Sequence, residues 1–270
     1  MNDPAAPLEF LEMKVDLRDA PGDAPDGAPR GAPEGGRSLT AVLLHGFGAG
    51  PGDLLPLAPL IGVAHRWYAP QAPVPIMVEG TLFGRAWFPR EERELRRALY
   101  GEYFLDLPGM DPPGLTEAAW AVRSFITERG LDPSRVVVIG FSQGAMVAAE
   151  MLRQGLAGRD RPFPAAAVLL SGALVAAERW SEGNLSAGDG SESGSGRESG
   201  GGCGALPPVL QAHGTQDRIL PFREGEALRE TLEAVGFPLQ WYPFEGDHAI
   251  PEEVVRRIRA FMTKIIENLP

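Results

Sequence analysis

One serine of this chain lies between two glycines, at a point where a strand-like apolar run gives way to helix-forming sequence. Residues 135–139 read RVVVI, residues 140–144 read GFSQG, and the following residues are rich in Ala and Met. A G-x-S-x-G sequence between a buried strand and a helix is typical of a nucleophile elbow, a sharp turn that lifts the serine above a sheet edge. The motif predicts a reactive Ser142, and a chance match in a glycine-rich chain is the alternative.

The rest of the chain alternates short apolar runs with amphipathic stretches. The strand-like runs lie at residues 40–44, 135–139, 165–170 and 208–212, and helical spacing of apolar residues marks 116–129 and 251–266. Residues 8–16 alternate apolar with charged side chains and predict an antiparallel edge strand. The expected fold class is therefore α/β, with a doubly wound, mostly parallel sheet covered by helices on both faces. Its ligand site should lie beyond the carboxyl ends of the strands.

Length and local composition predict one domain with two insertions. A chain of 270 residues suits a single hydrophobic core, so we expect residues 1–270 to form one domain. Residues 19–37 repeat Ala-Pro every four positions, and 13 of the 19 residues at 186–204 are Gly or Ser. Neither composition can build a core. We expect an extended linker in the first segment and a disordered surface loop in the second.

Charge and cysteine content exclude several classes of partner. The formal net charge of −11 disfavours binding to nucleic acid and to anionic lipid. The single cysteine, Cys203, cannot form an internal disulfide, and the N-terminal sequence lacks the features of a signal peptide. No apolar stretch reaches the ~18 residues of a membrane helix. These features predict a cytoplasmic protein without an integral membrane segment, and they leave its oligomeric state open.

Two aspartates are candidates for the acid of a catalytic triad. Asp217 follows the strand predicted at 208–212, where a carboxylate can accept the Nδ1 proton of a histidine and fix its tautomer. Asp247 is the second candidate, but it adjoins His248 in the sequence, and adjacent side chains on a loop seldom reach each other. Both fit the chain order Ser, acid, His, and the position just beyond a predicted strand favours Asp217.

The base must be one of four histidines, and His248 has the expected position. It follows the strand-like LQWYPF and precedes the final predicted helix, whereas His45 and His213 end predicted strands and His65 precedes an apolar run. No two of these histidines have the helical spacing of metal ligands, so no metal site is predicted.

Donors for a developing oxyanion are also expected near Ser142. The turn HGFGAG follows the strand at 40–44, and its Phe47 contributes one backbone N–H. The second is the N–H of Gln143, directly after the nucleophile. Together they predict an oxyanion hole made of main-chain groups.

Several segments resemble the phospholipase/carboxylesterase family, which includes the acyl-protein thioesterases. They are LLHGFGAGPGDLLPLA, GRAWFP, DPSRVVVIGFSQGAMVAAEM, HGTQDRILP and EGDHAIPEEV. The resemblance implies an α/β-hydrolase fold and a serine hydrolase that acts on small-molecule carboxylic esters or thioesters and needs no cofactor. It also implies Ser142 as nucleophile, Asp217 as acid and His248 as base.

The sequence leaves the substrate and some alternatives open. Trp87 and Phe88 belong to an aromatic-rich region that could form an apolar substrate-binding wall, although packing in the core explains them equally well. A catalytically silent binding protein with a hydrolase-like fold and a serine peptidase are the alternative functions. The first would be favoured by loss of a triad member, and the second by a large substrate-gating domain.

Overall fold

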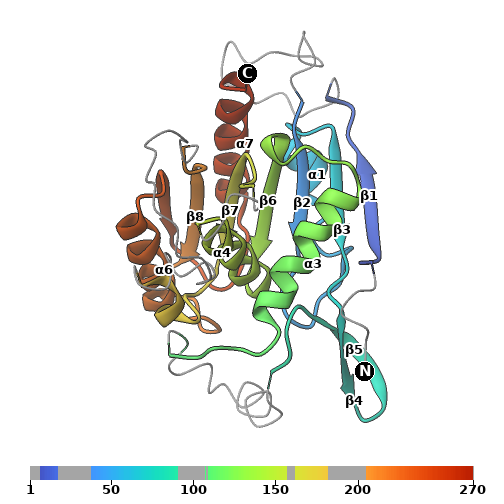
Figure 1. Ribbon diagram of the computed structural model, residues 1–270, viewed down its shortest axis with the longest axis vertical. Helices are drawn as coiled ribbons and strands as arrows, with labels where there is room; N and C mark the ends of the chain where they lie inside the picture. Colours follow the sequence, from blue (N-terminus) through green and yellow to red (C-terminus); the bar gives the residue numbers. More distant parts are fainter. Residues whose placement is uncertain are drawn as a thin grey trace, which may run out of the picture.

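A seven-stranded sheet forms the centre of the molecule (Figure 1). The computed structural model describes residues 7–17, 38–90, 107, 109–156, 162–181 and 205–269. The sheet has the order β1-β3-β2-β6-β7-β8-β9. Its strands are β1 (Phe10–Lys14), β2 (Thr40–Leu44), β3 (Arg66–Pro70), β6 (Val136–Phe141), β7 (Ala166–Leu170), β8 (Val209–Gly214) and β9 (Leu239–Phe244). Strand β1 is antiparallel to β3, and all other neighbouring pairs are parallel.

The described helices cover both faces of this sheet (Figure 1). They are α1 (Leu57–Ile61), α3 (Leu115–Glu128), α4 (Gln143–Leu156), α6 (Phe222–Val235) and α7 (Glu252–Glu267), with the short 3₁₀ turns η2 (Pro133–Arg135) and η3 (Ala177–Trp180). Alternate residues of one strand join opposite cores, because side chains of a strand alternate between faces. Val42 and Leu44 pack with α3, α4 and α6, whereas Ala41 and Leu43 pack with α1 and α7.

The predicted fold class is confirmed by this arrangement. The run at 8–16 contains the antiparallel edge strand β1, the two helices predicted from apolar spacing are α3 and α7, and the helix expected after Ser142 is α4. Strands β6 and β8 extend two residues beyond their predicted ends. The reason is that Gly140 and Gly214 still pair with neighbouring strands, at Leu169 and Phe244 respectively.

A separate hairpin follows β3 and was not predicted from the sequence. It consists of β4 (Val74–Val78) and β5 (Thr81–Ala86), joined through Glu79 and Gly80, which both have positive φ. In Figure 1 the hairpin projects from the sheet beyond the carboxyl end of β3. Helix α6, which is largely charged on its outer side, was not predicted either.

Three groups of predictions fall on residues outside the described ranges. They concern the Ala-Pro segment at 19–37, the Gly/Ser segment at 186–204 and the cysteine within it, Cys203. In the part of the chain that the structure covers, no helix has the length and apolar character needed to cross a bilayer.

Candidate active site

Ser142 lies in a strained turn between β6 and α4. Its φ is +55°, in the left-handed region that non-glycine residues rarely adopt. Its N–H donates to the Leu170 carbonyl at 2.9 Å, and its own carbonyl accepts the N–H of Ala145 at 2.9 Å, in the first turn of α4. This strand-turn-helix geometry is that of a nucleophile elbow.

Both glycines of the motif are required by close contacts of the backbone. A Cβ atom added to Gly140 would lie 2.3 Å from the Gly144 carbonyl oxygen, and one added to Gly144 would lie 2.0 Å from the Leu44 carbonyl oxygen. Helix α4 therefore begins directly against the ends of β2 and β6. Any larger residue at either position would push the helix, and Ser142 with it, away from the sheet.

Asp217 and His248 are in direct contact. The Oδ2 of Asp217 lies 2.7 Å from the Nδ1 of His248, and the aspartate side chain is completely buried. Its other oxygen, Oδ1, accepts the N–H groups of Ile219 and Leu220 at 2.9 and 2.8 Å. The carboxylate is thus fixed by its own loop and presents one oxygen to the imidazole.

Asp247, the alternative acid, contacts the backbone instead. Its Oδ1 accepts the N–H of Arg218 at 2.9 Å and the N–H of His248 at 2.8 Å. These hydrogen bonds lower the pKa of the Asp247 carboxyl. The side chain therefore joins the loop after β8 to the loop after β9, and Asp217 alone of the two contacts the imidazole.

The topology brings Ser142, Asp217 and His248 to one edge of the sheet. Ser142 follows β6, and Asp217 and His248 follow β8 and β9, all at carboxyl ends of parallel strands. The ring of His248 packs on the ring of Phe141, with centroids 4.8 Å apart. The imidazole therefore lies against the residue that directly precedes Ser142.

The expected oxyanion donors flank Ser142. A Cβ added to Gly46 would lie 3.3 Å from the Ser142 Cβ, so the turn that contains Phe47 lies beside the nucleophile. Gln143 is the first residue of α4, and the first N–H groups of a helix have no partner within it.

The Gln143 side chain has a structural role that the sequence did not reveal. It is buried, its Oε1 accepts the N–H of Trp87 at 2.8 Å, and its Nε2 donates to the Phe88 carbonyl at 2.9 Å. These two bonds tie the segment after β5 to the N-terminus of α4. The side chain of Gln143 thus stabilises the surroundings of its own N–H.

Trp87 and Phe88, the residues predicted to bind substrate, are buried in the core. Their exposed fractions are 1% and 0%. The indole of Trp87 donates to the His45 carbonyl at 2.8 Å and packs beside the His45 ring. This burial favours the packing alternative, because neither side chain offers surface to a ligand.

Exposed apolar side chains lie instead on the β4–β5 hairpin. Phe83 is 67% exposed, and Met77 and Leu82 are more than half exposed. The ring of Phe83 lies 3.4 Å from the position of a Cβ on Gly48, next to Phe47 in the turn of residues 45–50, where the sequence predicts an oxyanion donor and which is named the oxyanion turn for that reason. The turn sequence Glu79-Gly80 between two apolar runs is the signal that could have predicted this hairpin.

Backbone hydrogen bonds attach the hairpin to the oxyanion turn. The N–H of Gly48 donates to the Arg85 carbonyl at 2.9 Å, and the N–H of Arg85 donates to the Ala49 carbonyl at 3.1 Å. A Cβ on Gly84 would lie 2.0 Å from the Gly48 carbonyl oxygen. The two segments therefore approach at main-chain distance, and the position of one determines that of the other.

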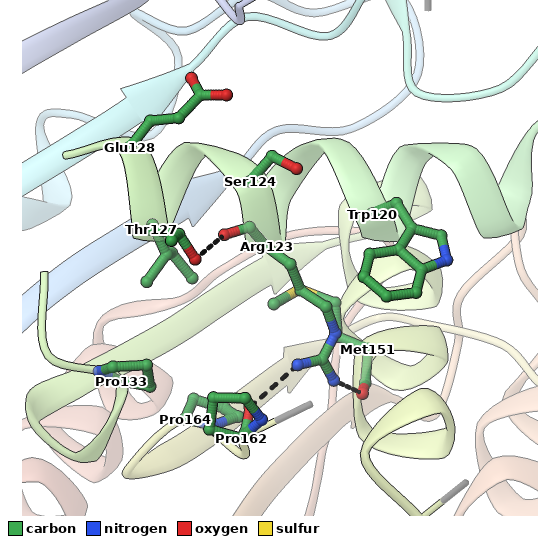
Figure 2. A pocket seen from close by; sticks show the side chains of 10 residues that line it. Trp120, Arg123, Ser124, Thr127, Glu128, Pro133, Met151, Pro162 and Pro164 are labelled. Carbon is green, nitrogen blue, oxygen red and sulfur yellow. Dashed lines mark hydrogen bonds between the residues drawn. The ribbon is translucent and has the colours of Figure 1, made fainter. Parts of the chain in front are cut away.

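A cavity of about 260 Å³ lies elsewhere (Figure 2). It is lined by residues of α3 from Trp120 to Glu128, by Met151 of α4, by Pro133 before β6 and by Pro162 and Pro164 before β7. Arg123 crosses it and donates to the carbonyls of Pro162 and Met151. These residues lie at the amino ends of the strands, so the cavity is remote from Ser142.

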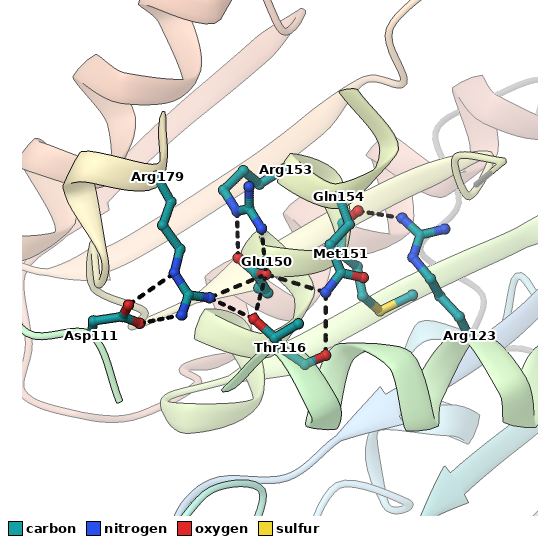
Figure 3. A network of polar contacts seen from close by, with 8 residues as sticks. All are labelled: Asp111, Thr116, Arg123, Glu150, Met151, Arg153, Gln154 and Arg179. Atoms are coloured by element: carbon teal, nitrogen blue, oxygen red, sulfur yellow. Dashed lines mark hydrogen bonds and ion pairs between the residues drawn. The ribbon is translucent and has the colours of Figure 1, made fainter. Parts of the chain in front are cut away.

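A buried carboxylate on α4 organises a polar network beside the core (Figure 3). Glu150 accepts hydrogen bonds from Thr116, Gln154 and both Nε and Nη2 of Arg153. The Glu150 carboxylate raises the pKa of Arg153. Arg179 donates to Thr116 and pairs with Asp111, so η3 is connected to α3 and α4.

The family comparison covers most of the chain, and one curated relative matches part of it. The profile of the serine hydrolase (FSH1) family matches residues 80–257. The acyl-protein thioesterase 1 of Gibberella zeae is 37% identical over 59 residues, which are 21% of this chain and 25% of that protein. The chain thus aligns with a quarter of the length of this relative.

Solved structures share the fold at lower identity. Esterase PE8 has a TM-score of 0.64 and 24% identity, covering 96% of this chain and all of that one. The acyl-protein thioesterase 2 of Zea mays has a TM-score of 0.63 and 21% identity, covering 87% and 96%. A carboxylesterase of Bacillus cereus has a TM-score of 0.60 and 19% identity, covering 97% and 96%. With the family match over residues 80–257, the chain belongs to the serine hydrolase (FSH1) family.

Proposed function

We propose that this chain hydrolyses carboxylic esters or thioesters through an acyl-enzyme on Ser142. The observation that carries the proposal is the strained Ser142 at the same sheet edge as the hydrogen-bonded pair of Asp217 and His248. A serine at a positive φ before a helix is costly to maintain, and such strain is concentrated at functional sites. Family membership and the printed names of the thioesterase and carboxylesterase relatives support the reaction class.

The proposed mechanism has two steps. His248 removes the Ser142 proton as the hydroxyl oxygen attacks the carbonyl carbon, and Asp217 accepts the Nδ1–H and stabilises the imidazolium. The backbone N–H groups of Phe47 and Gln143 stabilise the oxyanion, and one such donor is worth ~3 kcal/mol. The tetrahedral intermediate collapses, and the alcohol or thiol leaves with the proton from His248. Water activated by His248 then hydrolyses the acyl-enzyme and frees Ser142.

The substrate is proposed to be a small ester or thioester with an apolar part. The exposed Phe83 beside the oxyanion turn supports an apolar contact for the acyl or alcohol group. The reaction needs no cofactor in this scheme, because serine, histidine and water supply all the chemistry. We also propose that residues 1–270 act as one catalytic domain in the cytoplasm.

The three groups are expected to act as one unit, which defines the test. Ser142→Ala and His248→Ala should each abolish most turnover of p-nitrophenyl esters, and the double variant should be little worse than either. A fluorophosphonate should label the wild type at Ser142 only. Ser124→Ala, an exposed serine on α3, is the matched control and should retain full activity and labelling.

The same assays separate the alternatives. Turnover by a folded Ser142→Ala variant, or labelling at another serine, would contradict the proposed chemistry. No turnover of esters, thioesters or peptides by the wild type would favour a silent binding protein, and turnover of peptides alone would favour a peptidase. Comparing p-nitrophenyl esters of increasing chain length with an acyl thioester would identify the preferred class.

A further inference from the structure

A second histidine lies behind the triad acid. His213, near the end of β8, is completely buried. Its Nε2 lies 2.8 Å from the Leu220 carbonyl oxygen and 3.4 Å from the Oδ2 of Asp217. That same oxygen contacts Nδ1 of His248, so the Asp217 carboxylate lies between two imidazoles.

The surroundings determine which nitrogen of His213 carries the proton. Burial lowers the pKa of His213, although the hydrogen bond to the Leu220 carbonyl raises it in part. A neutral imidazole has one N–H, and a carbonyl oxygen can only accept, so the proton is on Nε2. The same N–H therefore faces the Asp217 carboxylate. The backbone of Gly172 also raises the pKa of the ring, but more weakly than Leu220 does, and Nδ1 makes no geometric hydrogen bond among the described residues, so the Leu220 carbonyl decides the tautomer.

Helix α6 holds the ring in this orientation. A Cβ added to Gly225 would lie 2.4 Å from Nδ1 of His213, and the ring of Phe222 packs edge-on with centroids 6.0 Å apart. The charged groups at this point of α6 are Glu224 and Arg223, which pair with each other at 3.0 Å. Glycine at position 225 is therefore what allows the ring to fit.

We propose that His213 is a positioning residue for the triad acid, with an Nε2–H that is anchored on Leu220 and keeps Oδ2 of Asp217 directed at His248. The inference rests on the proposed function. The separation of 3.4 Å is long for a hydrogen bond to a carboxylate, so the N–H acts mainly as a dipole with its positive end toward Oδ2. A neutral His213 suits this role. A protonated one would compete with the imidazolium of His248 for the same carboxylate.

The test removes the donor and then restores it. In the full chain, His213→Met should lower kcat for a p-nitrophenyl ester roughly tenfold and leave KM within about twofold, because the lost interaction supports the base and not substrate binding. His213→Gln should recover most of kcat, because its Nε2–H can replace that of the imidazole. His65→Met, which changes the exposed histidine before β3, is the matched control and should leave both constants unchanged.

A second variant displaces the ring without removing it. Gly225→Ala should lower kcat with little change in KM, because the new methyl group overlaps Nδ1 of His213. This variant decides the question if His213→Met does not fold. A folded His213→Met with wild-type kcat, a His213→Gln as impaired as His213→Met, or an unimpaired Gly225→Ala would each overturn the inference. These outcomes leave the proposed function intact, because the wild type would still hydrolyse esters and be labelled at Ser142. A wild type that neither hydrolyses esters nor is labelled at Ser142 would overturn the proposed function itself.

Discussion

Two carboxylates lie near His248, and they contact different parts of it. Asp217 contacts Nδ1 of the ring, whereas Asp247 accepts the backbone N–H of the same residue. A triad acid must hold the ring tautomer, so only the first contact fits that role. The second contact fixes the loop that carries the ring.

This difference predicts unequal effects of two matching substitutions. Asp217→Asn should lower kcat about 10³–10⁴-fold, because the amide favours the wrong histidine tautomer. Asp247→Asn should change kcat by less than about threefold, because the amide oxygen can still accept the two backbone N–H groups. Steady-state kinetics on both folded variants provide the measurement. A larger loss of kcat in Asp247→Asn than in Asp217→Asn would identify Asp247 as the triad acid instead of Asp217.

The β4–β5 hairpin carries apolar surface to the edge of the oxyanion turn. Its Met77, Leu82 and Phe83 are exposed and are not part of the core. The hairpin is attached to the turn after β2 by backbone hydrogen bonds of Gly48 and Arg85. The three exposed side chains are therefore free to vary without loss of the hairpin's position, whereas Gly84 is not, because a Cβ there would lie 2.0 Å from the Gly48 carbonyl oxygen.

A substitution on this hairpin should change how kcat/KM depends on the acyl-chain length of the substrate. Phe83→Ala should lower kcat/KM for octanoyl esters about tenfold and hardly affect acetyl esters, since each buried methylene contributes ~0.8 kcal/mol. Leu60→Ala removes another large apolar side chain that is more than half exposed, on α1, and should have no effect at either length. Equal losses across chain lengths in Phe83→Ala would remove the hairpin from the substrate site.

Glu150 connects α4 to α3 and η3, and its burial makes this network important for stability. Its side chain is 2% exposed, so Glu150→Gln removes the carboxylate that pairs with Arg153 and one of the two that pair with Arg179, and it should lower the free energy of unfolding by about 3 kcal/mol. The exposed pair of Glu252 and Arg256 gives the comparison, and Glu252→Gln should cost less than about 0.5 kcal/mol. Urea unfolding measures both. Equal costs would mean that solvent screens the network.

For the whole molecule, buried neutral histidines predict weaker folding in acid. Burial lowers the pKa values of His45 and His213 below the 6.5 of an exposed histidine. Below that pH the unfolded chain binds more protons than the folded one, so stability falls as the pH decreases toward the folded pKa values. Asp247 has a lowered pKa, and its contribution is lost only below its unfolded value of 3.8.

The expected result is a Tm that decreases between about pH 6.5 and pH 5. His45→Gln and His213→Gln should each flatten part of this decrease, whereas His65→Gln, at an exposed position, should follow the wild type. Thermal unfolding monitored by circular dichroism across this range gives the slopes. Parallel curves for all four proteins would show that other groups cause the dependence.

The sequence by itself determined the features that local patterns encode. Apolar periodicity identified the central strands and α3 and α7, because each pattern depends only on neighbours a few residues away. The GFSQG motif identified the elbow at Ser142, because a Cβ on either of its glycines would lie only 2.3 or 2.0 Å from a backbone oxygen, so no larger residue fits there. The order Ser, acid, His restricted the partners to Asp217 or Asp247 and His248.

Only the tertiary structure decided which of these side chains meet. Asp217 and His248 are 31 residues apart and touch because β8 and β9 are neighbours in the sheet, whereas Asp247 is adjacent to His248 and contacts only its backbone. Trp87 and Phe83 are both aromatic residues of one short segment. Trp87 is buried and donates its backbone N–H to the Gln143 side chain, whereas Phe83 is exposed on the hairpin. Contacts of this kind depend on strand order and on the direction of each side chain. Both are determined by packing between residues that are distant in the sequence.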